Sequence, residues 1–345
     1  MSAGRIQHVI AQAGWGGGAE RHYADVMLGL RDRGWEQIVH LPGEGGLTDR
    51  LRAEGIAVRT HSLHRKSLSA HLRLLAAQRR FKPHVVMTLF ARACQIAARL
   101  PAPVAHQAAL LDGAKYLRRA AAVIAPSAAA AGALARLGTH PDRIRVIANH
   151  RVARGQDHAA SSRRGRRLIG VGRLDPIKGF HHLIAALSFL PDDATLTLVG
   201  DGPERARLEA VAAPFGARVR FLGWREDAPA LMAEADLLVM ASGFETFGLV
   251  VLEAWAAGAI AVVTPGSGPE EIVRACDPAL VADAATPEAL AATIRFALDA
   301  PETRKAAWRS AARAALEDKF GREGRLDAYE ALLRSLTAGD HIKSI

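Results

Sequence analysis

The sequence predicts an α/β protein built from two doubly wound domains, each with a mainly parallel sheet. Three observations predict this fold class. Short hydrophobic runs alternate with helical patterns along the chain, which is typical of strand–helix–strand crossovers. The alternation stops at a polar segment and then starts again. A chain of 345 residues is also long enough for two domains of ordinary size.

The first domain is expected over residues 1–150. Its clearest helical stretches are Ala19–Arg33 and Ala128–Leu137. The hydrophobic runs that we expect to form its strands are Arg5–Ala11, Gln37–Leu41, Val58–Ser62, His84–Thr88, Val104–Ala108, Val123–Pro126 and Arg145–Ala148.

A linker is predicted over residues 151–167, which are polar, rich in Arg and Ser, and without apolar periodicity. The second domain follows over residues 168–325, and a C-terminal helix and tail occupy 326–345. The expected strands are Leu168–Val171, Thr195–Val199, Val219–Leu222, Leu237–Ala241 and Ala259–Val263. The expected helices are Phe180–Leu190, Arg205–Ala213, Ala228–Glu234, Phe247–Ala257, Pro287–Leu298, Thr303–Phe320 and Leu326–Thr337. A ligand should bind beyond the carboxyl ends of the strands, between the two domains.

Composition narrows the class of protein. Hydrophobic residues make up 50% and charged residues 23%, the balance of a globular chain. Two distant cysteines fit neither a disulfide framework nor a metal knuckle. No signal peptide and no run of about 18 apolar residues is present, so we expect a cytoplasmic protein, at most peripheral to a membrane. Residues 1–160 carry 23 Lys and Arg against 10 Asp and Glu, yet no nucleic-acid recognition motif accompanies this charge.

A glycine-rich loop follows the first predicted strand and opens the first helix. Gly17 and Gly18 would let the backbone approach a ligand closely, and the helix N-terminus offers N–H groups to an anion. The loop does not have the GxGxxG spacing, which disfavours a nicotinamide site. A tight strand-to-helix turn is as good an interpretation of this loop as a ligand-binding site.

A second loop, Val171–Gly179, follows the first strand of the second domain. Gly172 is followed by the cations Arg173 and Lys178, and a helix comes next. Two cations at the carboxyl end of a strand suit a diphosphate group, whereas the alternative is a surface loop with incidental charges.

The third cluster lies between residues 241 and 253 and contains two glutamates. Glu245 sits in a loop after a buried strand, and Phe247, Gly248 and Leu249 open a helix whose backbone N–H groups can hold a phosphate. Glu253 lies in an apolar stretch of that helix, where a carboxylate needs a partner. The alternatives are compensation of the helix dipole for Glu245 and a solvated helix face for Glu253.

These motifs together resemble the family 4 retaining glycosyltransferases of GT-B fold, with two Rossmann-like domains. The segment ETFGLVVLEAWAAG resembles the two-glutamate motif of that family, and GRLDPIKG resembles its diphosphate-binding loop. LVGDGPERARLE, VRFLGW and GWGGGAER match further pieces in the right order. The resemblance is dense over residues 168–275 and thinner before them. It also implies that the closing helices, Thr303–Phe320 and Leu326–Thr337, cross back onto the first domain.

The resemblance implies a retaining transfer of a hexose from a nucleotide-diphosphate sugar, without a metal held by the protein or another cofactor. Arg173 and Lys178 would stabilise the leaving diphosphate, helped by the helix N-terminus at residues 247–249. Glu245 would orient the sugar and Glu253 the ribose. Gly17 and Gly18 would approach the sugar phosphate, Gly172 belongs to the diphosphate loop, and Leu222 ends the strand that contacts the base.

His106 lies where the family often carries a histidine near the sugar, although a neutral core or surface histidine is as good a reading. Two positions depart from the family pattern. Asn149-His150 stands in place of Asn-Gly, and Ala241 replaces a proline. Neither change removes a group that stabilises charge.

The first domain should bind the acceptor, either a glycan or a lipid-linked molecule of cell-surface polysaccharide or lipopolysaccharide synthesis. Its basic segment Arg59–Lys82 carries leucines at helical spacing, Leu68, Leu72 and Leu75. This helix either rests on an anionic membrane or packs its leucines on the sheet. Packing on the sheet is the favoured interpretation. Two alternatives to transfer are an epimerase or phosphorylase on the same scaffold and a non-catalytic nucleotide-sugar-binding subunit.

Overall fold

The computed structural model describes residues 3–63, 68–109, 111, 113–151 and 165–338. The chain divides into two compact units. Unit 1 comprises residues 1–152 and 322–345, and unit 2 comprises residues 153–321. Of the predicted linker 151–167, residues 152–164 lie outside the described part of the chain.

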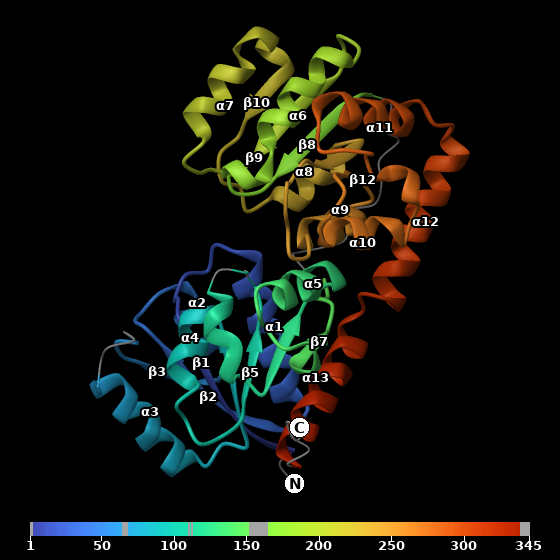
Figure 1. Ribbon diagram of the computed structural model, residues 1–345. Helices are drawn as coiled ribbons and strands as arrows, with labels where there is room; N and C mark the ends of the chain where they lie inside the picture. Colours follow the sequence, from blue (N-terminus) through green and yellow to red (C-terminus); the bar gives the residue numbers. More distant parts are fainter. Residues whose placement is uncertain (1–2, 64–67, 110, 112, 152–164, 339–345) are drawn as a thin grey trace. The chain divides into compact units, whose positions relative to one another are not determined.

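Unit 1 is built on a seven-stranded parallel sheet with the strand order β3-β2-β1-β4-β5-β6-β7 (Figure 1). The order reverses next to β1, as in a doubly wound fold. All seven strands that we predicted in this half are present. Their bounds are β1 Gly4–Ile10, β2 Trp35–Leu41, β3 Ala57–Thr60, β4 Val85–Leu89, β5 Val104–Gln107, β6 Ala122–Ala125 and β7 Ile144–Val146.

Helices cover both faces of this sheet, since side chains alternate along each strand. Ile6 and Ile10 of β1 belong to one core cluster, with Met27 of α1. Val9 belongs to the other, with Leu74 of α3. The helices of unit 1 are α1 Gly18–Asp32, α2 Gly46–Ala53, α3 Leu68–Phe81, α4 Ala91–Ala97, α5 Ala128–Arg136 and α13 Arg322–Thr337.

Unit 2 repeats this plan with five parallel strands in the order β10-β9-β8-β11-β12. The order reverses next to β8, so crossovers to β9 and to β11 leave on opposite faces. The strands are β8 Arg167–Val171, β9 Thr195–Val199, β10 Val219–Phe221, β11 Leu237–Met240 and β12 Ile260–Val263. The helices are α6 Phe180–Ala186, α7 Arg205–Ala212, α8 Ala228–Glu234, α9 Leu249–Ala256, α10 Gly268–Arg274, α11 Pro287–Asp299 and α12 Glu302–Asp318.

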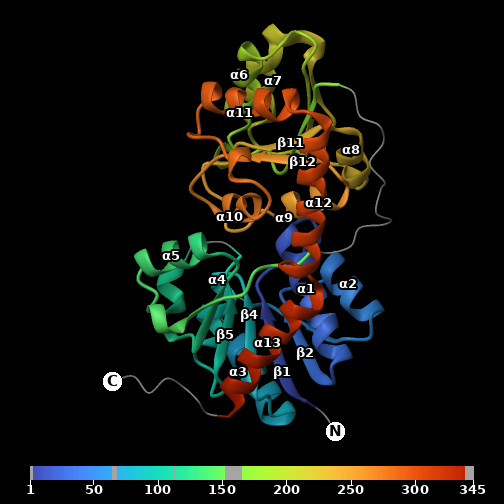
Figure 2. The ribbon, with the colours of Figure 1, turned by 90° about the vertical axis from the view of Figure 1, so that its right-hand side faces the viewer.

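Of the two closing helices, α12 stays in unit 2, whereas the last helix, α13, returns to unit 1 as the family resemblance implies. Figure 2 shows it lying along α1. Tyr329, Leu333 and Leu336 of α13 are buried in the same core cluster as Met27 of α1. The first unit therefore closes its core with residues from the far end of the chain.

One predicted helix begins later than expected, and three short helices were not predicted. The helix expected to begin at Phe247 begins at Leu249, because Gly248 has a φ of 98°, which no helical residue adopts. The helices α2, α4 and α10, which are seven or eight residues long, were not predicted.

The basic segment Arg59–Lys82 forms a helix only from Leu68, and its residues 64–67 lie outside the described part of the chain. Leu72 of the predicted leucine stripe is 55% exposed, whereas Leu74 and Gln78, one turn apart, are buried. Leu75 of the same stripe packs against the core cluster of Val9 and Leu74, so the predicted packing holds for Leu75 but not for Leu72.

Candidate active site

In unit 2, two of the predicted loops leave the same edge of the sheet. The strands are parallel, so their carboxyl ends meet at one edge. The loop after β8 carries Gly172, Arg173 and Lys178, and the loop after β11 carries Glu245. Because β8 and β11 are neighbours at the point where the strand order reverses, the two loops lie side by side.

The loop after β8 is tied to the end of β9 by backbone hydrogen bonds. The N–H of Gly172 donates to the carbonyl of Val199 at 2.9 Å, and the N–H of Leu174 donates to Asp201 at 2.9 Å. A Cβ atom on Gly200 would overlap the carbonyl oxygen of Gly172. Glycine is therefore needed at residue 200, and the loop is held in place before any ligand arrives.

Lys178 and Glu245 form an ion pair between the two loops. Their side chains are 23% and 22% exposed. Two backbone contacts bring the loops together. The N–H of Gly243 donates to the carbonyl of Ile177 at 2.9 Å, and Gly179 leaves no space for a Cβ beside the carbonyl of Ala241. Two of the predicted catalytic residues are thus brought together by the fold.

Arg173 lies in the same loop but makes a different contact. Its guanidinium pairs with Asp175 at 2.7 Å, and its side chain is 69% exposed. The structure therefore does not bring Arg173 to Glu245, and the long side chain extends into solvent.

The loop of Glu245 leads directly into α9. Gly248 is the residue before the helix, in a left-handed conformation with its Cα facing Pro269, whose Cγ would lie 2.7 Å from an added Cβ. Phe247 is 3% exposed, so it can offer a ligand only its backbone. The N-terminal N–H groups of the helix thus begin at Leu249, later than predicted.

The two remaining donor-site predictions lie on the same edge of unit 2. Glu253 is on the second turn of α9 and is half-buried, although its neighbours Leu252 and Ala254 are buried. Leu222 follows β10, is half-buried, and its N–H donates to the carbonyl of Leu198 at 2.9 Å.

In unit 1 the glycine loop ends at the N-terminus of α1. Gly17 precedes the helix and Gly18 is its first residue. Glu20, which the sequence analysis did not select, folds back over Gly17 so closely that a Cβ there would overlap its carboxylate. Burial raises the pKa of Glu20. The spacing of a capping box, three residues from the cap, was the signal that could have identified it.

His106 lies within β5 and is 1% exposed. Its Nδ1 is 2.8 Å from the hydroxyl of Thr88, and burial lowers the pKa of the imidazole to about 3. The ring is therefore neutral at physiological pH. Its surroundings are those of a core histidine, which was the alternative interpretation of His106 from the sequence. A role near the sugar stays a prediction.

The family model for Glycosyltransferase Family 4 matches residues 16–150, and the model for Glycosyl transferases group 1 matches residues 157–314. The lipopolysaccharide core biosynthesis glycosyltransferase LpsE of Rhizobium meliloti (strain 1021) is 32% identical over 92% of this chain and 96% of that protein. The chain belongs to glycosyltransferase family 4.

Other relatives agree with this assignment. The lipopolysaccharide core biosynthesis glycosyltransferase LpsD of the same organism is 29% identical, over 94% of this chain and 96% of that protein. The fold matches the crystal structure of Anabaena Alr3699/HepE in complex with UDP and glucose, with a TM-score of 0.82, 24% identity, and 95% and 99% of the two chains covered. Lipopolysaccharide outer core galactosyltransferase WaaB has a TM-score of 0.73 at 16% identity, over 97% and 99%. The GT-B fold is thus confirmed.

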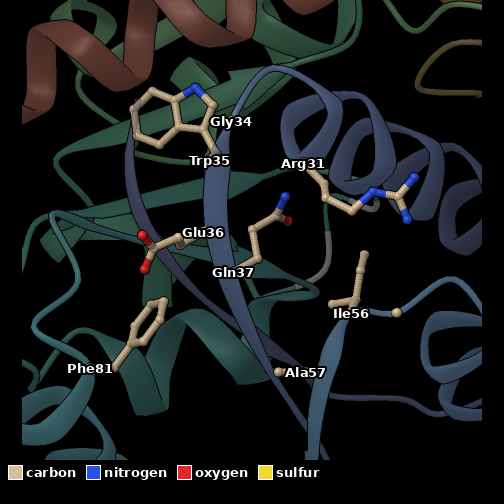
Figure 3. A pocket seen from close by; sticks show the side chains of 9 residues that line it. Arg31, Gly34, Trp35, Glu36, Gln37, Ile56, Ala57 and Phe81 are labelled. Atoms are coloured by element: carbon tan, nitrogen blue, oxygen red, sulfur yellow. The ribbon is translucent and has the colours of Figure 1, made fainter. Parts of the chain in front are cut away.

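One pocket of this glycosyltransferase lies away from the predicted site. It has a volume of about 440 Å³ and opens where β2 and β3 begin, at the amino ends of the strands. Figure 3 shows the side chains of Arg31, Glu36 and Phe81 around it. None of the predicted site residues lines this pocket, so we assign it no part in the transfer.

Among the described residues, no group of three or more His, Cys, Asp and Glu is placed to hold a metal ion. Both cysteines are unpaired, and burial raises the pKa of Cys94 to about 12 and of Cys276 to about 11. In the part of the chain that the structure covers, no helix is both long and apolar enough to cross a bilayer.

A segment that supports the candidate site was missed by sequence reasoning. The N–H of Gly268, at the start of α10, donates to the carbonyl of Glu245 at 2.9 Å, and an added Cβ would lie 2.5 Å from the carbonyl oxygen of Thr246. The Gly-Ser-Gly-Pro run after β12 was the available signal, since Pro often opens a helix.

Proposed function

We propose that this protein transfers a hexose from a UDP-sugar to an acceptor of lipopolysaccharide core synthesis, with retention of the anomeric configuration. The observation that carries the proposal is the Lys178–Glu245 pair at the reversal point of the unit 2 sheet, next to the start of α9. The acceptor class is supported by the names of LpsE and LpsD, and the donor by the UDP bound to HepE. Family 4 membership supports retention.

The ion pair suggests how the donor is engaged. The diphosphate of the donor replaces Glu245 as the partner of Lys178, because a diphosphate carries more negative charge than one carboxylate. Glu245 is then released to accept hydrogen bonds from the sugar hydroxyls. The N–H groups at the start of α9 and the exposed Arg173 complete the stabilisation of the leaving diphosphate.

Glu253 is proposed to bind the ribose hydroxyls and Leu222 to contact the base. From unit 1, Gly17 and Gly18 are proposed to approach the sugar phosphate, and His106 keeps its proposed place near the sugar. The acceptor oxygen attacks from the face that the diphosphate leaves, so its proton passes to a phosphate oxygen of the leaving group and no protein nucleophile is required.

The first test is a thermal-shift comparison of UDP, GDP and ADP and their sugar conjugates. A nucleotide at about 100 times its Kd stabilises the folded state by about 2.7 kcal/mol, so we expect a clear rise in Tm with UDP. The rise should be lost in Glu253→Ala and Arg173→Ala. The matched controls Glu209→Ala and Arg166→Ala alter surface ion pairs of unit 2 and should keep it.

A shift with GDP or ADP alone would overturn the proposed donor base, and a full shift in both site variants would overturn the site. Product analysis with a stable UDP-hexose then decides the chemistry. Transfer with an unchanged anomeric configuration is expected, and inversion or epimerised free donor would refute the proposed reaction.

We further propose that the transfer needs no metal held by the protein, because Lys178, Arg173 and the start of α9 supply the positive charge that a metal would. Initial rates should therefore be the same after exhaustive chelation with EDTA. Loss of activity that Mg²⁺ or Mn²⁺ restores would contradict this.

We also propose that α3 rests on an anionic membrane surface. Arg73, Arg79 and Arg80 are exposed on this helix, and Leu72 is 55% exposed beside them. Vesicles with anionic lipid should retain the protein at low salt and release it at high salt, since salt screens such attraction. The double change Arg79→Gln and Arg80→Gln should weaken retention. Absence of binding at low salt would refute the idea.

A further inference from the structure

The chain passes from unit 2 back to unit 1 between Gly321 and Arg322, and both sides of this crossing are anchored. The anchor in unit 2 is Phe320, which is 8% exposed. Its ring lies 5.9 Å from the ring of Phe247, edge to face, and 6.4 Å from the ring of Trp255. Phe247 stands between Glu245 and Gly248, so the crossing begins on the loop that enters α9.

The anchor in unit 1 is Asp25 of α1. Its Oδ2 accepts a hydrogen bond from Nε of Arg322 at 2.7 Å and lies 2.6 Å from Nε2 of His150. His150 is fully buried and stands two residues before the chain leaves unit 1. The carboxylate of Asp25 therefore binds one residue near each of the two points at which the chain passes between the units.

The pKa of Asp25 and the packing around His150 both favour these two contacts. Burial alone would raise the pKa of Asp25, but the hydrogen bonds from His150 and Arg322 outweigh burial and lower it. The ring of His22 packs 4.6 Å from that of His150, and its Nε2 accepts the backbone N–H of His150 at 3.3 Å. The carboxylate stays ionised and keeps both partners.

The position of α13 on α1 is also set by close contacts. Asp25, Gly29 and Arg33 are four residues apart and so lie on one face of α1. A Cβ on Gly29 would overlap the end of the Leu326 side chain, which packs closely against this glycine. Arg33 pairs with Glu323, Asp327 and Glu330 at 2.7, 2.6 and 3.3 Å.

Only Gly321 separates Phe320 from Arg322, the residue that is bound to Asp25. Consecutive Cα atoms are about 3.8 Å apart, so Phe320 and Arg322 cannot separate by more than about 7 Å. Gly321 has no space for a side chain either, because a Cβ would overlap the carbonyl of Glu317. The torsions of Gly321 can absorb a rotation, but a translation of Arg322 must pull on Phe320.

We propose that Asp25 and Phe320 are positioning residues that couple the Glu245–Gly248 loop of unit 2 to the start of α13 in unit 1, through the one-residue link at Gly321. The proposal rests on the proposed function for its catalytic meaning, since that loop carries Glu245. The coupling itself is a property of the chain and can be measured without substrate.

Amide hydrogen exchange of the full-length protein, without nucleotide, tests the coupling. In Asp25→Asn, peptides covering residues 243–250 of unit 2 should exchange about fivefold faster or more, the lower end of measured couplings between sites. The matched control is Asp32→Asn on the same helix, which alters only an exposed pair with Arg31 and should leave these peptides unchanged.

The reverse experiment reads unit 1. Phe320→Leu should speed exchange in peptides covering residues 322–330, because coupling between two sites is reciprocal. Its control, Phe296→Leu, removes another aromatic contact of unit 2, with Trp308, and should not. This variant also keeps the proposal testable if Asp25→Asn does not fold.

Faster exchange confined to the unit that carries the substitution would overturn the proposal in either experiment. A failure of the proposed function is distinguishable from this outcome. It would be seen in the unaltered protein as absence of UDP stabilisation and of sugar transfer, whatever the exchange rates show. If both proposals hold, Asp25→Asn should lower kcat more than it changes the KM for acceptor, although Asp25 touches neither substrate.

Discussion

Lys178 and Glu245 form an ion pair although 67 residues separate them in the sequence. Both side chains are mostly shielded from solvent, so neither ion is fully hydrated and each depends on the other. In the proposed function, Lys178 exchanges Glu245 for the more highly charged diphosphate of the donor. This is why the pair is more informative about donor binding than either residue alone.

Replacing Lys178 by alanine should lower kcat by about 100- to 1,000-fold, the usual cost of removing one group that stabilises developing charge. Initial rates at saturating donor would measure this. Lys305→Ala is the control, since that lysine of unit 2 only caps the carbonyl of Leu298. A rate for Lys178→Ala equal to that of the control would contradict the assigned role.

Glu245→Gln should change the affinity for UDP as well as the rate of transfer. Without the carboxylate, Lys178 has no partner to give up, so UDP should bind more tightly while transfer of the sugar slows. Titration calorimetry with UDP and rate measurements on the same sample separate the two effects. Weaker UDP binding in this variant would show that Glu245 does not compete with the diphosphate.

At the scale of elements, the entry to α9 depends on backbone shape. Gly248 adopts a φ of 98° and faces Pro269, and Gly268 bonds to the carbonyl of Glu245. These contacts join the N-termini of α9 and α10 around one loop. The direction of the first N–H groups of α9 is set by this packing.

Gly248→Ala should destabilise unit 2 by about 1–3 kcal/mol, because a Cβ strains the left-handed residue and meets Pro269. It should also weaken UDP binding, since the start of α9 shifts. Gly243→Ala is the matched control in the same loop. An added Cβ there has its nearest neighbour at 3.9 Å. Chemical unfolding of both variants measures the difference, and equal stability would refute the argument.

At the scale of the whole molecule, unit 1 contains several buried neutral histidines. Burial lowers the pKa of His8, His40 and His106 to about 3 in each case. His8 is hydrogen-bonded to Tyr23 and Gln37, and His40 to His61, so the rings are held in place without a charge. In the unfolded chain each would titrate near its ordinary value of 6.5.

Unit 1 should therefore lose stability as the pH falls below about 6.5. In that range the unfolded state binds protons that the folded state does not, so stability falls by about 1.4 kcal/mol per pH unit for each fully titrating histidine. Asp25 adds to the loss only at lower pH, because its folded pKa lies below 3.8. Urea unfolding between about pH 7 and about pH 5 tests this, and a constant unfolding free energy for unit 1 would contradict it.

Much of the architecture was determined by the sequence alone. The strands of both sheets were predicted near their true positions. The return of α13 to the first unit was implied by the family resemblance. The loops with Gly17, Arg173, Lys178 and Glu245 were selected because glycines, cations and carboxylates follow strands there. The strand predictions succeed because periodicity and turn chemistry are local properties, readable within about ten residues.

The tertiary structure alone decided which of these residues meet. The strand order places β8 beside β11, and so Lys178 beside Glu245, while Arg173 pairs with Asp175 instead. The tertiary structure also buries His106, begins α9 at Leu249 instead of Phe247, and brings Arg322 to Asp25. The physical reason is that strand pairing and close packing depend on contacts between distant parts of the chain, which no local pattern encodes.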